Sequence, residues 1–77
     1  MNTEQLKSML DIQFNSIVVE RFDIKEIRKS VRNLRLQITE YFRNGQKQLA
    51  QIASNALRNL INEIDAHHQM VVSNMSV

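Results

Sequence analysis

The chain has 77 residues, a net charge of +2, no cysteine, no proline and a single glycine. This length suits one small domain, and the missing cysteines exclude disulfides, thiolate metal sites and cysteine nucleophiles. So few turn-forming residues exclude a β fold and a glycine-rich phosphate loop, so the composition predicts an all-α domain.

The first predicted helix covers about residues 4–19. Its apolar residues recur at helical spacing, and Asn2 or Thr3 can cap its start. Gln5 stands where it could complete a capping box around Asn2. Residues 17–19 are all β-branched, so we expect the helix to fray or become extended there.

The second predicted helix, residues 24–43, has signals at both ends. Asp23 can cap the first turn, and Glu26 is placed to return a hydrogen bond to the Asp23 amide, as in a capping box. Phe22, just before the cap, can close a hydrophobic staple. Gly45, the only glycine, follows the last turn, where a left-handed residue commonly ends a helix.

Apolar residues of this helix form one narrow stripe at spacings of 3, 4, 3, 4 and 3, which is typical of a packed helix pair. They are Ile24, Ile27, Val31, Leu34, Ile38 and Tyr41. Segment 21–47 also holds eight of the ten basic residues and three of the eight acidic ones. The basicity of the chain therefore belongs to its middle helix.

The basic residues gather on one side of this helix, where Arg28, Arg32 and Arg35 have basic residues but no acidic residue three or four positions away. Such like-charge pairs disfavour an isolated helix, so we expect compensation from outside it. Glu4 and Asp11 of the first helix could supply it, as could phosphates or an acidic protein. The alternative is a solvated face whose charges are screened by salt. The candidate binding residues include one leucine that projects among the arginines, and they are Lys25, Arg28, Lys29, Arg32, Arg35, Leu36 and Arg43.

The third predicted helix covers about residues 46–72, and we expect a frayed tail at 73–77. Because only a short turn precedes it, this helix should form an antiparallel hairpin with the second helix. Its apolar residues form a wide stripe that needs more than one neighbour, so we expect a dimeric helical bundle. The predicted core and oligomer residues are Leu49, Ile52, Ala53, Ala56, Leu57, Leu60, Ile61 and Ile64.

No constellation of residues indicates catalysis. His67 and His68 are adjacent, so on a helix they point about 100° apart and cannot grip one metal ion together. We expect His67 to pack and His68 to face solvent, with no metal and no cofactor. The first residues are not basic and no long apolar run follows them, so we expect no signal peptide, no membrane span and a cytoplasmic location.

These features predict a small non-enzymatic regulatory or adaptor protein. It would bind itself as a homodimer and bind an acidic surface of another protein through a helix face. The alternative is sequence-independent binding of a DNA or RNA backbone by the basic side of the second helix.

Overall fold

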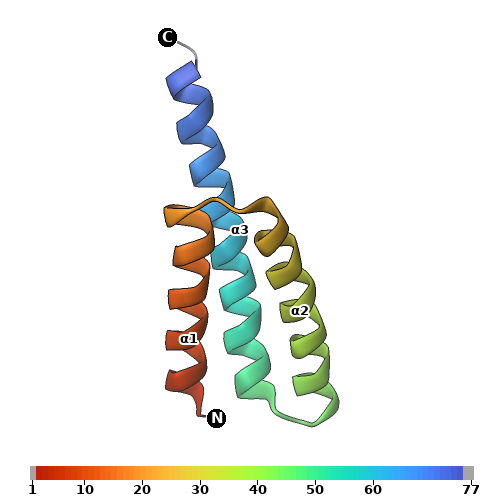
Figure 1. Ribbon diagram of the computed structural model, residues 1–77. Helices are drawn as coiled ribbons and strands as arrows, with labels where there is room; N and C mark the ends of the chain where they lie inside the picture. The colour runs from red at the N-terminus through yellow and green to blue at the C-terminus, as the bar shows by residue number, and fades with distance from the viewer. Residues whose placement is uncertain (1, 76–77) are drawn as a thin grey trace.

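Three α-helices make up the chain in a computed structural model that describes residues 2–75 (Figure 1). The helices are α1 (Thr3–Asn15), which continues into the π-helical turn η1 (Ser16–Glu20), α2 (Ile24–Arg43) and α3 (Lys47–Met75). No β-strand occurs among these residues, so the predicted all-α fold is confirmed.

Asn2 caps α1 with a complete capping box. The Gln5 amide donates to Asn2 Oδ1 at 2.8 Å, and the Asn2 amide donates to Gln5 Oε1 at 3.4 Å. The sequence suggested that the helix frays or becomes extended near its end. Instead, after Asn15 it widens into η1. There Ile17 and Val18 are both buried, so the apolar side chains that disfavour a regular helix are kept in the core.

α2 begins at Asp23, but without the capping box that the sequence suggested. The Asp23 carboxylate accepts hydrogen bonds from the amides of Lys25 and Glu26, at 3.1 and 3.3 Å. The Asp23 amide donates instead to the carbonyl of Ile17 at 2.9 Å. Because η1 already satisfies that amide, the side chain of Glu26 has no capping bond to make.

A Schellman motif ends α2. The Gln46 amide donates to the carbonyl of Tyr41 at 2.8 Å, and the Gly45 amide donates to the carbonyl of Phe42 at 3.1 Å. Gly45 has φ = 75°, the left-handed conformation that glycine adopts without strain. The next helix starts directly afterwards, and α2 and α3 run in opposite directions (Figure 1).

α3 is the element against which the others pack. Both α1 and α2 contact it, and it lies between them in the view of Figure 1. The buried core takes apolar residues from every element: Leu6, Leu10, Phe14, Ile17, Val18, Ile27, Leu34, Ala53, Ala56 and Leu60. One buried polar side chain, Ser30, accepts a hydrogen bond from Gln13 at 3.4 Å and so links α2 to α1.

Most of the wide stripe of α3 is covered within the chain. Ala53, Ala56 and Leu60 are buried, whereas Ile61 is 42% exposed. The other predicted residues of the stripe are half-buried against the core, and they are Leu49, Ile52, Leu57 and Ile64. Ala50, which the sequence did not single out, is fully buried. The packing of α1 explains this cover, since it supplies the second neighbour that the stripe requires.

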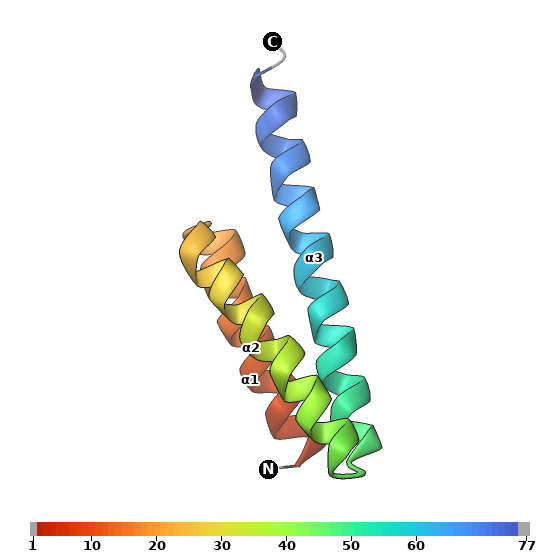
Figure 2. The ribbon, with the colours of Figure 1, turned by 90° about the vertical axis from the view of Figure 1, so that its right-hand side faces the viewer.

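α3 is much longer than its neighbours. At 1.5 Å per residue its 29 residues span about 43 Å, against about 30 Å for the 20 residues of α2. Its C-terminal part therefore projects beyond α1 and α2, as Figure 2 shows. Residues 73–75, which were expected to fray, continue the helix, and residues 76–77 lie outside the described residues.

Candidate functional site

An open groove of about 500 Å³ runs along one flank of α2. Its lining comes from α2 alone and combines apolar residues with arginines. We call it the basic groove, and its residues are Ile27, Arg28, Val31, Arg32, Arg35, Leu36 and Thr39.

Helical spacing explains the shape of the basic groove. Ile27, Val31, Arg35 and Thr39 are four residues apart and form one ridge along the helix, while the other three residues form the neighbouring ridge. Two adjacent ridges of this kind enclose a furrow between them. The basic groove is therefore a helix-packing groove along the edge where the core-facing side of α2 meets its exposed arginines.

The floor of the basic groove is apolar. Ile27 is buried and Val31 is half-buried against the core, so both are held in place from beneath. Leu36 stands at the other ridge with 62% of its surface exposed. Since these three residues offer no hydrogen-bonding side chain, the floor suits an apolar ligand surface rather than a polar one.

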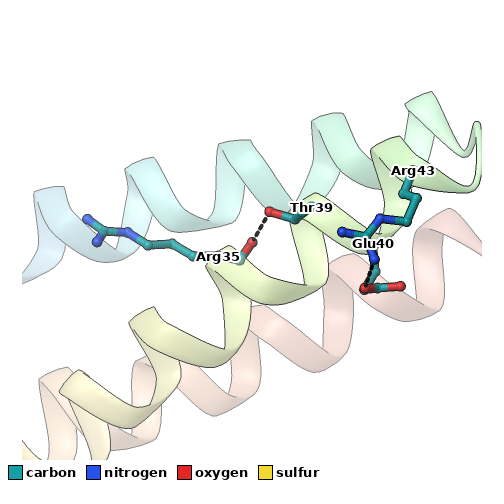
Figure 3. A network of polar contacts seen from close by, with 4 residues as sticks. All are labelled: Arg35, Thr39, Glu40 and Arg43. Carbon is teal, nitrogen blue, oxygen red and sulfur yellow. Dashed lines mark hydrogen bonds and ion pairs between the residues drawn. The ribbon is translucent and has the colours of Figure 1, made fainter.

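Arginines form the rim, and none of them pairs with an acidic residue in the part of the chain that the structure describes. The one ion pair among the described residues joins Arg43 to Glu40, at 3.4 Å and in an exposed position (Figure 3). Arg28, Arg32 and Arg35 make no ion pair with any described residue. Their guanidinium groups are therefore available for an anionic ligand, and each can hold a carboxylate or phosphate with two hydrogen bonds.

Thr39 closes one end of the basic groove. Its hydroxyl donates to the carbonyl of Arg35 at 3.1 Å, as Figure 3 shows. The hydroxyl proton is therefore used within the helix, as is common for threonine in a helix. A ligand at this end of the groove can therefore contact the Arg35 side chain, whereas the Thr39 hydroxyl proton is already bound within the helix.

The sequence suggested that acids of α1 compensate the basic side of α2, but they do not. α1 packs mainly on α3, and Asp11 lines the grooves between these two helices together with Asn59. Glu4 makes no ion pair with a described residue either. No described acid of α1 therefore pairs with the basic residues of α2.

The predicted binding residues divide into two groups. Arg28, Arg32, Arg35 and Leu36 all line the basic groove, whereas Lys25, Lys29 and Arg43 do not. Ile27, Val31 and Thr39 were not predicted as groove residues from the sequence. Their spacing of four residues, in line with Arg35, does indicate that they share its ridge. Ile27 and Val31 were assigned to the packing stripe alone, but they contribute to both surfaces.

The histidine pair is divided between packing and solvent. The ring of His67 stacks on Phe22, with centroids 4.2 Å apart and planes 13° from parallel, and His68 is exposed. No group of three or more potential metal ligands occurs among the described residues. None of the helices in that part of the chain combines the length and the apolar composition that a membrane crossing requires.

Comparisons with protein-family models, curated proteins and solved structures find no match for this chain. The basic groove therefore has to be interpreted from its own geometry and charge.

Proposed function

We propose that this protein is a small, non-enzymatic regulatory or adaptor protein that binds an acidic α-helix of another protein in the basic groove. It would act as a homodimer in which α2 and α3 form an antiparallel helical hairpin. One observation carries the proposal: the basic groove has an apolar floor and a rim of three arginines that pair with no acid among residues 2–75.

The shape of the basic groove favours a helical ligand. A furrow between two ridges of residues four apart accepts the corresponding ridge of another helix, which then crosses at about −50°. Apolar side chains on that ridge would reach Val31 and Leu36. A helix therefore matches the groove in shape and in the polarity of its floor.

The charge of the rim favours an acidic ligand. Each of Arg28, Arg32 and Arg35 can pair with a carboxylate, and such pairs relieve the repulsion among the arginines themselves. Carboxylates beside the apolar ridge of the ligand would place the charged pairs at the edge of the contact. This arrangement of an apolar centre and a charged rim is common in protein–protein interfaces.

A second candidate is sequence-independent binding to the backbone of DNA or RNA. The unpaired arginines support it, because they would contact phosphates as readily as carboxylates. Three phosphate contacts would give log K against log salt a slope of about −3. The apolar floor favours the protein ligand, since a phosphate backbone gains nothing from contact with Leu36.

Affinity capture from a lysate of the source cells, with and without nuclease, tests the proposal. We expect a discrete protein that survives nuclease and is lost with Leu36→Asp and with the double variant Arg32→Glu, Arg35→Glu. Both variants change exposed residues, so the fold should persist.

Two controls are matched to these variants. Lys25→Glu with Lys29→Glu makes the same charge change on the same helix outside the basic groove, and Ile12→Asp changes a leucine-sized exposed residue on α1. Both should retain the partner. If Leu36→Asp retains it, the floor is not used. If nuclease removes all captured material, the nucleic-acid candidate replaces the protein one.

A further inference from the structure

α3 carries a second stripe that begins at the edge of the core and continues beyond it. Leu57, Ile61, Ile64, His68 and Val71 recur at spacings of 4, 3, 4 and 3. That spacing defines the narrow seam along which two helices wind around each other in a coiled coil. We call these five residues the second stripe.

The second stripe is only partly covered by its own chain. Leu57 and Ile64 are half-buried, but Ile61 and Val71 are 42% and 43% exposed, and His68 is exposed as well. Beyond His67, which stacks on Phe22, α3 projects past α1 and α2 (Figures 1 and 2). Two of the five residues, His68 and Val71, therefore lie where the chain supplies no second helix.

The chain exposes more surface than a compact monomer of its mass. The chain exposes 5892 Å², and its extents are 50 × 19 × 17 Å. A compact monomer of 9.0 kDa exposes roughly 4900 Å², about 1000 Å² less. A stable dimer of ordinary size buries about 800 Å² on each partner, which is close to this excess.

The charge of the projecting segment is compatible with an identical partner. Residues 66–73 contain no acidic and no basic residue apart from the two histidines. A second copy would therefore meet little like-charge repulsion there, and a charged partner would find no opposite charge to select it. This contrasts with the basic groove, where like copies would repel each other.

We propose that two copies of this chain pair through the second stripe of α3, as a symmetric helix–helix contact in which each copy offers the same residues. This inference rests on the proposed function only for the expectation of a dimer. The interface is separate from the basic groove, which leaves both grooves of the dimer open to ligands.

Molecular mass in solution, measured by sedimentation equilibrium over a range of concentrations, tests this pairing. The wild-type chain should have the mass of a dimer, and Ile61→Asp with Val71→Asp should have that of a monomer. The helical circular dichroism should stay unchanged, because both residues are exposed. Ile12→Asp and Leu36→Asp, which lie outside the second stripe, should remain dimeric.

A variant that strengthens the contact keeps the test open even if the aspartates unfold the chain. His68→Leu replaces the polar residue of the seam by an apolar one, so the dimer should dissociate at least about tenfold less readily. A dissociation constant that does not change would contradict the pairing.

Three other results would overturn the inference. In the first, the wild-type chain is monomeric at every concentration. This result counts against the pairing even if the second stripe binds a different protein. In the second, a dimer survives Ile61→Asp with Val71→Asp. In the third, Leu36→Asp breaks the dimer, which would place the contact in the basic groove. Only the third of these results bears on the proposed ligand site.

Discussion

At the scale of single residues, three arginines define the function proposed for this chain. Arg28, Arg32 and Arg35 surround an exposed leucine, and none of them pairs with a described acid. Arg32 has Arg28 four residues before it and Arg35 three residues after it, so it is repelled from both sides. This arrangement lowers the stability of the free helix and is consistent with selection for binding.

Arg32→Glu should therefore stabilise the chain while it weakens binding. The substitution turns the pairs with Arg28, Lys29 and Arg35 from repulsive to attractive, and each pair is worth about 0.2–0.5 kcal/mol. We expect the free energy of unfolding to rise by about 1–3 kcal/mol, measured by urea denaturation at low salt. A loss of stability would show that Arg32 serves the fold.

The conformation and ring contact of Phe22 could not be predicted from its local sequence. The sequence suggested that it closes a hydrophobic staple, but it has φ = 44° and stacks on His67, which is 45 positions away. A left-handed phenylalanine costs about 1–2 kcal/mol. The ring stack and the hydrogen bond from the Asp23 amide to Ile17 offset that cost, and both depend on elements that are distant or distorted.

At the scale of elements, the sequence predicted a helix end correctly where the hydrogen-bonding groups that form it lie close together in the sequence. The capping box of Asn2 and Gln5 and the glycine stop of α2 are both formed. The capping box at Asp23 was wrong because the π-helical turn η1 supplies a carbonyl from outside the local sequence. Such a widened turn depends on burial of Ile17 and Val18, which no local signal specifies.

Gly45 tests the stop of α2 without disturbing any packing. A Cβ atom at Gly45 would meet nothing within 4 Å, so only its backbone conformation opposes substitution. Gly45→Ala should lower the free energy of unfolding by about 1 kcal/mol, since alanine disfavours a positive φ. Gly45→Asn should lose less, because asparagine tolerates that region better. Equal losses in thermal denaturation would argue against a conformational cause.

At the scale of the whole molecule, the sequence indicated the surfaces but not which neighbour covers each one. The wide stripe of α3 was expected to need a second copy, yet α1 covers most of it. The C-terminal part of α3 projects beyond α1 and α2. The sequence could not show where this part begins, because the length of α3 does not determine where along it α1 and α2 end. The arginines of the basic groove were found because they share one helix.

The two surfaces proposed for this chain are spatially separate. The basic groove lies on α2, and the second stripe follows the far half of α3. A dimer joined through α3 would thus present two grooves, which is the arrangement that an adaptor with two identical binding sites requires. Two linked sites raise the overall affinity for a partner that also has two copies of its helix.

The most direct measurement is site-specific photocrosslinking in the source cells, with a photoreactive residue in place of Leu36. The binding proposal predicts a covalent adduct with another protein, attached at an acidic helical segment. The same residue in place of Ile12, which is 70% exposed on α1, should give no such adduct. An adduct with nucleic acid, the same adduct from both positions, or no adduct at Leu36 would contradict the basic groove as a site for a protein helix.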